Sequence, residues 1–146
     1  MWTENPIFRE DLDRLTSYDY IPWDDLRDST VFITGATGLI GYTAVCALLR
    51  YDQLHDAGIK VVALVRDVGR AEAKFSRQIA DGCDITFIRG SVEYLPEIVG
   101  KIDYIIHGAC PTSSQYFVDH AVETIDTIVN GTKNVLDLSL IHISEP

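Results

Sequence analysis

The sequence is poor in basic residues, with 12 Lys and Arg against 22 Asp and Glu, so its formal net charge is -10. Such a balance argues against nonspecific binding to nucleic acid or to an anionic membrane, and no local basic cluster offsets it. We therefore expect no nucleic-acid and no membrane partner. A small anionic ligand has to be held by local dipoles and by one or two cations.

Cysteine is also scarce, and the three cysteines share no metal-type spacing. An odd number of such residues (Cys46, Cys83 and Cys110) is typical of reduced thiols in a cytoplasm, not of a disulfide framework or a metal site. No apolar run reaches the roughly 18 residues that a membrane span needs, and the N-terminus lacks the layout of a signal peptide. These absences predict a soluble, cytoplasmic protein without a metal.

What the sequence does contain is a glycine triplet in Thr34–Gly41, where Gly35, Gly38 and Gly41 are spaced three residues apart. The apolar run Val31–Ile33 precedes it and a helical pattern over Tyr42–Leu49 follows. A strand, a glycine turn and a helix in this order predict a dinucleotide-binding loop, in which free N–H groups and the helix dipole face a pyrophosphate. The alternative is a structural turn. The predicted cofactor contacts here are Gly35, Thr37, Gly38, Leu39, Ile40 and Gly41.

A second apolar run, Lys60–Val65, predicts a buried parallel strand after a helix that ends near Asp56-Ala57-Gly58, with the glycine as its stop. Arg66 and Asp67 follow this strand, at the position where dinucleotide-binding folds contact the adenosine ribose. A carboxylate there bonds the ribose hydroxyls and selects NAD, whereas an arginine accommodates the 2′-phosphate of NADP. With both charges present, NAD and NADP stay open, and so does a role for Arg66 as a solvated surface charge.

Caps and hydrophobic spacing predict the remaining elements. Asn5 and Pro6 indicate the start of a helix that runs to Leu15, and Asp67 indicates the N-cap of another. An aromatic connector over residues 18–23 packs against the domain edge or, alternatively, binds a partner. The other expected elements are a helix over 68–80 with a stripe of Ala71, Phe75 and Ile79, stopped by Asp81-Gly82, a strand over 85–88, a short helix over 94–99, a strand over 102–107 and a helix over 118–136.

Alternating strands and helices predict an α/β fold, a Rossmann-type doubly wound parallel sheet, truncated after the helix that follows the fourth strand. The expected division is an N-terminal helix and connector (1–29), an incomplete NAD(P)-binding domain (30–137) and a tail (138–146). Two further turns at strand ends belong to the predicted site. The end of the strand over 102–107 and the turn after it contain the cofactor candidates His107, Gly108 and Ala109 and the substrate-side candidates Thr112, Ser113 and Ser114, and the turn after the strand over 85–88 belongs to the site through the resemblance given below. For His107 we expect a structural role in shaping the crevice, with acid–base catalysis as the alternative.

The chain from about Thr30 to Leu136 resembles the extended short-chain dehydrogenases/reductases, the NAD-dependent epimerase/dehydratase group. The residues that carry the resemblance are the glycine loop, His107-x-Ala109-Cys110-Pro111, Tyr116, Val122-x-Thr124-Ile125-x-Thr127 and Gly131-Thr132-x-Asn134, which resemble UDP-glucuronate decarboxylases and sugar-nucleotide dehydratases. The resemblance implies NAD as cofactor and a nucleotide-sugar substrate. It also implies that Ser91 and Val92 are cofactor contacts in a turn that lines the adenine, and that the full-length protein can form a homodimer.

Three positions depart from the pattern of that family. Ser91 stands where an aspartate is usual, Gly108 replaces a leucine, and Ile128 replaces an asparagine that supports the active site. The family's catalytic pair, a tyrosine with a lysine four residues later, is missing, since none of the seven tyrosines has that lysine. We therefore expect the chain as given to have no catalytic residues and no activity.

The last nine residues, 138–146, resemble an in-frame translation of the transposon end and adapter used to prepare DNA sequencing libraries. The last native residue is then about Asp137; the alternative is a genuine helix end followed by a short strand over 140–143. The leading hypothesis is the cofactor half of a nucleotide-sugar epimerase, dehydratase or decarboxylase. The alternatives are a noncatalytic NAD(P) sensor domain and an NADP-dependent ketone reductase, the latter favoured by Arg66.

Overall fold

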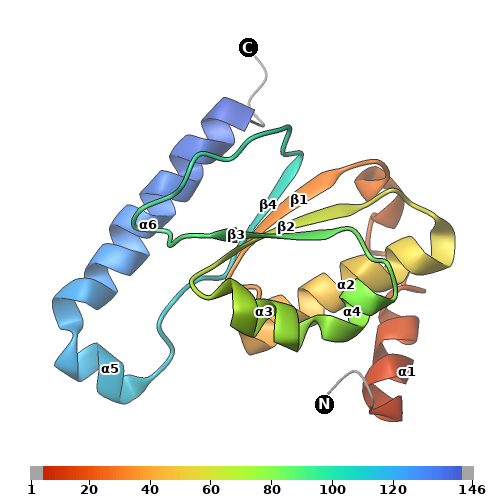
Figure 1. Cartoon of the computed structure of the whole chain (residues 1–146), viewed down its shortest axis with the longest axis horizontal. Coiled ribbons are helices and arrows are strands. Elements are labelled where there is room, and N and C mark those ends of the chain that lie inside the picture. Colours follow the sequence, from red (N-terminus) through yellow and green to blue (C-terminus); the bar gives the residue numbers. More distant parts are fainter. Residues whose placement is uncertain (1–4, 143–146) are drawn as a thin grey trace.

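The computed structural model describes residues 5–142, which form one parallel sheet with helices on both of its faces (Figure 1). The elements in chain order are α1 (Pro6–Leu15), the 3-10 helix η2 (Trp23–Leu26), β1 (Thr30–Thr34), α2 (Leu39–His55), β2 (Lys60–Val65), α3 (Val68–Lys74), α4 (Ser76–Ala80), β3 (Ile85–Arg89), β4 (Tyr104–His107), α5 (Ser114–Asp119) and α6 (Ala121–His142).

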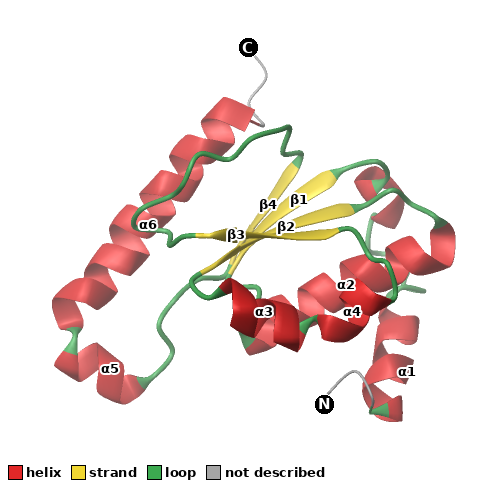
Figure 2. Ribbon diagram, viewed as in Figure 1, coloured by secondary structure: helices red, strands yellow, loops and turns green. Residues whose placement is uncertain are grey.

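The strand order in the sheet is β3-β2-β1-β4, and every neighbouring pair is parallel (Figure 2). Thr34 at the end of β1 lies beside Leu64 of β2 and His107 of β4, so the strands end at one edge. The reversal of order between β1 and β4 is the switch point at which open α/β sheets bind ligands. The prediction of a Rossmann-type α/β fold is confirmed.

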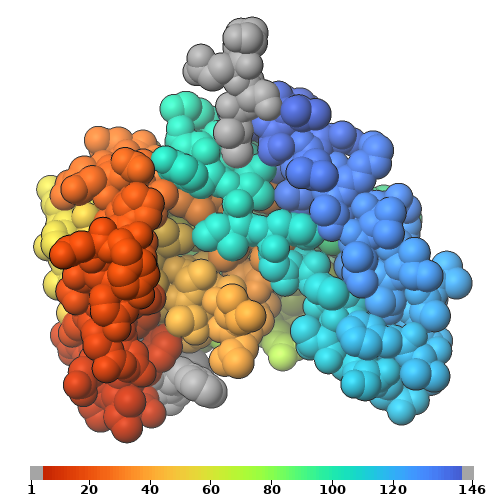
Figure 3. Space-filling view, turned by 180° about the vertical axis from the view of Figure 1, so that it is seen from behind, coloured from red at the N-terminus to blue at the C-terminus, as the bar shows by residue number. Residues whose placement is uncertain are grey.

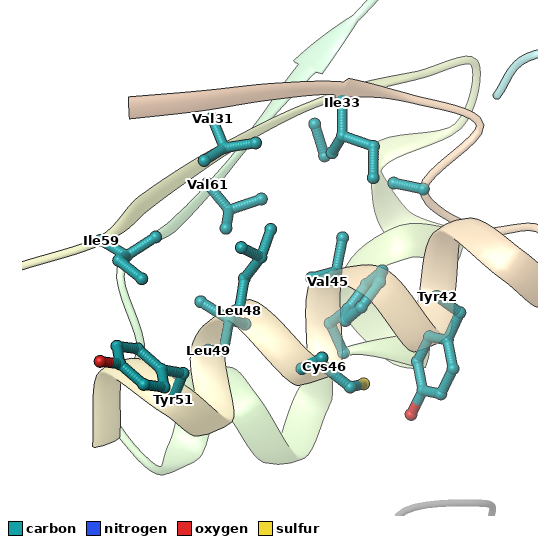
Figure 4. Close-up of a cluster of buried hydrophobic side chains, with 14 of the residues drawn as sticks. Val31, Ile33, Tyr42, Val45, Cys46, Leu48, Leu49, Tyr51, Ile59 and Val61 are labelled. Carbon is teal, nitrogen blue, oxygen red and sulfur yellow. The ribbon is translucent and has the colours of Figure 1, made fainter. Parts of the chain in front are cut away.

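One face of the sheet is covered by α2, α3 and α4, and α1 packs on the outside of α2. Figure 4 shows Val31 and Ile33 of β1 and Val61 of β2 pointing toward Val45, Leu48 and Leu49 of α2. Burying one such aliphatic side chain contributes about 1.5–3 kcal/mol to folding. This cluster therefore fixes the middle of α2 against β1 and β2.

The opposite face is covered by α6 and by the long connection between β3 and β4. Val135 and Leu138 of α6 pack on Phe32 of β1 and Leu64 of β2, together with residues of the long connection between β3 and β4. The outer face of α6 is open, because Val122 is 76% and Ile125 is 61% exposed. Ile128 and Val129 are exposed as well. The apolar face of α6 is thus only partly covered by the described residues.

The strongest local signals give the predicted elements. Asn5 caps α1, since its side-chain oxygen accepts a hydrogen bond from the Ile7 N–H at 2.9 Å, and Pro6 opens the helix. The strand over Lys60–Val65 has the predicted bounds. Trp23 of the aromatic connector is buried and its ring stacks 4.8 Å from that of Tyr51. The connector packs against the domain edge, as expected.

One predicted helix is absent: residues 94–99 form an irregular segment, which Figure 2 draws as part of a loop. Pro96 lies in its middle, where it has no N–H to donate and restricts the preceding residue to an extended conformation. It packs against the backbone of Gly90, where an added Cβ would lie 2.7 Å from the Pro96 Cδ atom. Tertiary packing of this proline replaces the expected helix.

Two long helices of the prediction are broken. The helix over 68–80 divides at Phe75, whose φ of -100° and ψ of 16° leave the α-helical region, and Ile79 is exposed instead of joining the buried stripe. The last helix begins as α5 and breaks at His120. The strand over 102–107 is shorter, because β4 begins at Tyr104, although Ile102 is buried.

The C-terminal prediction differs too, since α6 continues past Leu136 to His142 and buries Leu138. Residues 143–146 lie outside the described residues, and the adapter origin of 138–146 stays a prediction.

The helix α2 ends with Asp56 as its C-cap, which has the left-handed conformation with a φ of 47°, two residues before the predicted glycine stop at Gly58. Within residues 5–142, no helix is both long and apolar enough to cross a membrane.

Candidate nucleotide-binding site

The predicted site residues gather at the carboxyl edge of the sheet. The glycine loop follows β1, Arg66 follows β2, Gly90 follows β3 and Gly108 follows β4. The Gly90 N–H donates to the Val65 carbonyl at 3.0 Å, so the turn after β3 lies against the end of β2. Four segments far apart in the sequence thereby form one surface.

Close backbone packing explains two of the three loop glycines. Gly35 has a φ of +74°, and a Cβ there would lie 2.5 Å from the carbonyl carbon and oxygen of Gly108. A Cβ on Gly41 would lie 2.2 Å from the Gly35 oxygen. Both glycines are therefore required for the loop to fold between α2 and the turn after β4.

Gly38 has a different role, because an added Cβ would meet only the Gly35 oxygen, at 3.2 Å. It is the N-cap of α2, makes no side-chain capping hydrogen bond, and leaves the first-turn N–H groups of Leu39, Ile40 and Gly41 to point out of the helix. The side chains of Leu39 and Ile40 are 70% and 84% exposed. Figure 3 shows this segment in a hollow between the N-terminal segment and α5.

Lys74 also contacts this loop, and sequence reasoning missed it. Its ammonium donates to the Thr37 carbonyl at 2.6 Å and lies 4.8 Å from the centre of the Tyr42 ring. Lys74 is 37 residues from Thr37, and nothing in its local pattern distinguishes it from a solvated helix lysine. Its position beside the loop follows from the tertiary packing of α3 and could not be predicted from neighbouring residues.

At the ribose-reading position, Arg66 and Asp67 are both exposed. One Asp67 oxygen accepts the Arg70 N–H at 2.9 Å, which confirms the predicted N-cap of α3, and the carboxylate keeps acceptor sites for further hydroxyl groups. Glu93 is a further carboxylate near Arg66. Burial alone raises the pKa of Glu93, but the hydrogen bond from Thr127 and the charge of Arg66 are among the effects that lower it overall.

The predicted adenine-lining turn is held from behind by α6. The Asn134 side-chain amide donates to the carbonyls of Val92 and Glu93, at 2.9 and 3.0 Å, and Thr127 donates to the Glu93 carboxylate. Gly131 lets the helix approach, since a Cβ there would lie 2.6 Å from a Val92 methyl. The spacing of residues 127, 131 and 134 places all three on one face of the helix.

His107 lies between two threonines at the centre of the edge. Thr34 Oγ1 accepts the N–H groups of Gly108 and Ala109 at 3.2 Å each, so its own hydrogen is available for His107 Nδ1 at 2.7 Å. The Nε2 atom then carries the ring proton and donates to Thr132 Oγ1 at 3.2 Å. Burial lowers the pKa of His107, which favours this neutral form.

Because the folded chain resists protonation of His107, stability should fall on acidification. The unfolded chain takes up the proton as the pH drops through about 6.5, whereas the folded chain takes it up only at lower pH. Between about pH 7.5 and 5.5, the melting temperature of His107→Gln should therefore fall less than that of the wild type, since glutamine does not titrate. Equal pH dependence of the two proteins would contradict a neutral, half-buried His107.

The substrate-side candidates Thr112, Ser113 and Ser114 are exposed at the start of α5, with Ser114 as the first residue of that helix. Ser113 caps α5, because its side chain accepts the Tyr116 N–H at 3.4 Å. All three cysteines are free thiols, and burial raises the pKa of Cys46 to about 11, so it is an unreactive core residue.

In the described part of the chain, no three His, Cys, Asp or Glu side chains gather as a metal site would require.

The chain is similar to known proteins over most of its length. The model of the NAD dependent epimerase/dehydratase family matches residues 31–143. The NAD-dependent epimerase/dehydratase FUM13 of Gibberella moniliformis (strain M3125 / FGSC 7600) is 30% identical over 116 residues, which cover 73% of this chain and 30% of that protein. The NAD-dependent epimerase/dehydratase ALT6 of Alternaria alternata is 25% identical over 117 residues, covering 73% and 31%.

Among solved structures, the X-ray structure of Pen from Bacillus thuringiensis matches with a TM-score of 0.65 at 20% identity. The match covers 80% of this chain and 35% of Pen, and it shows a shared fold. The chain spans about 30% of the length of the two curated relatives.

Proposed function

Since the chain belongs to the NAD-dependent epimerase/dehydratase family, we propose that it is the cofactor-binding half of an enzyme that acts on a nucleotide sugar. The observation that carries this proposal is the start of α2, where Gly38 leaves backbone N–H groups open beside the switch point of the sheet. Converging N–H groups and the positive end of a helix dipole are suited to a pyrophosphate.

The residues at the edge fit a nicotinamide dinucleotide. The amides of Leu39, Ile40 and Gly41 would hold the pyrophosphate, Arg66 and Asp67 would face the adenosine ribose, and the turn at Ser91 and Val92 would border the adenine. Gly108 and Ala109 border the crevice on the β4 side. Gly38 adds no side chain at the N-cap of α2, so the phosphates can approach the backbone there, whereas Gly35 and Gly41 let the loop pack closely enough to form.

A bound nicotinamide supplies the acceptor and later the donor of a hydride. This chain's residues bind and orient it: Thr34 and His107 fix the turn after β4, and α6 holds the adenine turn. We further propose that the acid–base Tyr-x-x-x-Lys pair is supplied by residues outside these 146, so the chain alone is inactive. The nucleotide-sugar class rests on the resemblance of the fourth strand and its helix to UDP-glucuronate decarboxylases.

A second candidate is an NADP-dependent ketone reductase of the same superfamily, which Arg66 favours because it directly follows β2. The nearby Glu93 and Asp67 oppose this candidate, since a 2′-phosphate beside Arg66 would meet their negative charges. NAD is therefore the favoured cofactor of the two.

Replacing Arg66 by Ala tests the proposal and the cofactor choice together. The wild type should bind NADH and NADPH in a fluorescence titration, and Arg66→Ala should weaken NADPH about tenfold more than NADH, because only NADPH presents a 2′-phosphate to the guanidinium. Arg14→Ala in α1 removes the same charge away from the strand ends and should leave both affinities unchanged.

The two failures can be told apart. If the wild type binds neither dinucleotide, the proposed function is wrong. If the wild type binds both and the ratio of the affinities does not move in Arg66→Ala, the arginine is a surface charge.

A further inference from the structure

Lys74 makes a contact with the glycine loop that neither the glycine motif nor the position after β2 explains. It is the last residue of α3, yet its side chain reaches the loop after β1 and donates to the Thr37 carbonyl at 2.6 Å. Its ammonium also lies 4.8 Å from the centre of the Tyr42 ring.

The contact fixes the orientation of one peptide group. The N–H that shares this peptide with the Thr37 carbonyl belongs to Gly38 and donates to the Gly35 oxygen at 2.9 Å. Both ends of the peptide are thus engaged. Because the Thr37 carbonyl points to Lys74, its oxygen would not point at a phosphate bound to the N–H groups at the start of α2.

The surroundings of the ammonium hold it in place. The Tyr42 ring packs 5.0 Å from Phe75 and 6.2 Å from Phe8, measured between ring centres, so it is a fixed surface for a cation. Lys74 itself is half-buried. The chain has a net charge of -10, which repels anions, so a localised positive charge beside the glycine loop should strengthen the binding of an anion there.

We propose that Lys74 is a positioning residue for the cofactor pyrophosphate, holding the Thr37 carbonyl away from the phosphates and adding a positive charge to the loop. The inference rests on the proposed function and deepens it. Arg66 lies before the start of α3 and Lys74 at its end, about 10 Å apart along a seven-residue helix. The two cations therefore serve different groups: Arg66 the 2′-position of the ribose, Lys74 the pyrophosphate.

Charge removal and charge retention at residue 74 test this division. In Lys74→Met the aliphatic stem still covers Tyr42 but the ammonium is lost, and affinity for NADH, NADPH and ADP-ribose should fall about tenfold at low salt. The NADH to NADPH ratio should not change, and affinity for adenosine, which has no phosphate, should stay within twofold. Lys74→Arg should recover most of the affinity, and added salt should weaken the wild type more than Lys74→Met.

Lys133→Met on α6 is the matched control, because it removes the same charge from an exposed pair with Asp137. It should bind all four ligands as the wild type does. Isothermal titration gives the affinities, and circular dichroism confirms that each variant is folded.

Three results would overturn the inference. One is a wild type that binds NADH and a folded Lys74→Met that binds it within twofold. Another is an equal loss for adenosine and ADP-ribose, which would show that the lysine only supports the fold. A wild type that binds no dinucleotide would instead remove the proposed function, and this inference with it.

Discussion

Replacing Gly38 by Val is expected to weaken dinucleotide binding at least about 100-fold, or about 2.8 kcal/mol, while the fold is kept. The side chain would stand at the N-cap of α2, where the phosphates must approach the backbone. Folding should survive, because an added Cβ at Gly38 meets only the Gly35 oxygen, at 3.2 Å, and the backbone φ of -72° suits any residue. Fluorescence titration with NADH measures the loss.

Two further glycine variants show that the effect belongs to the phosphate and not to the loop as a whole. Gly38→Ala adds the Cβ alone and should lose less affinity than Gly38→Val. Gly35→Ala should lower the melting temperature instead, because its Cβ would lie 2.5 Å from Gly108 at a φ of +74°. A folded Gly38→Val that binds NADH with wild-type affinity would remove the glycine loop from the site.

The second large effect concerns the open side of the sheet. β4 is an edge strand, and the outer face of α6 exposes Val122, Ile125 and Val129. Each uncovered aliphatic side chain forgoes about 1.5–3 kcal/mol of burial, and a bare strand edge pairs readily with other chains. We therefore expect the chain to self-associate. The double variant Val122→Lys, Ile125→Lys should shift it strongly toward monomer in sedimentation velocity, and its melting temperature should equal that of the wild type.

Val135→Ala on the covered face of the same helix is the control. Val135 is 4% exposed, so its truncation should lower stability by about 1–3 kcal/mol without reducing association. A longer chain that covers β4 and α6 should raise the melting temperature and reduce self-association together. A wild type that is monodisperse and melts cooperatively would show that the four-stranded sheet is complete as it stands.

The elements that could be predicted from sequence are those whose signals are local. The Asn5-Pro6 start of α1 and the strand over Lys60–Val65 depend on neighbouring residues alone, and both have the predicted bounds. The glycine spacing likewise predicts a strand–turn–helix unit that is present between β1 and α2. Their order along the chain was enough to predict a parallel Rossmann-type sheet.

What sequence reasoning missed depends on contacts between distant segments. The interactions of Lys74 with Thr37, of His107 with Thr34 and of Asn134 with Val92 span 37, 73 and 42 residues. No periodicity or motif spacing encodes such pairs. The absent helix over 94–99 has the same origin, because the packing of Pro96 on Gly90 outweighs the local pattern.

The central claim, that the carboxyl edge of this sheet binds a nicotinamide dinucleotide, is tested most directly by locating the bound ligand. Amide chemical shifts of the ¹⁵N-labelled chain should change on addition of ADP-ribose at Gly38–Gly41, at Arg66 and at Ser91–Val92. The same titration of Gly38→Val should leave them unchanged. Saturable binding that shifts other amides and leaves the start of α2 unaffected would contradict the account.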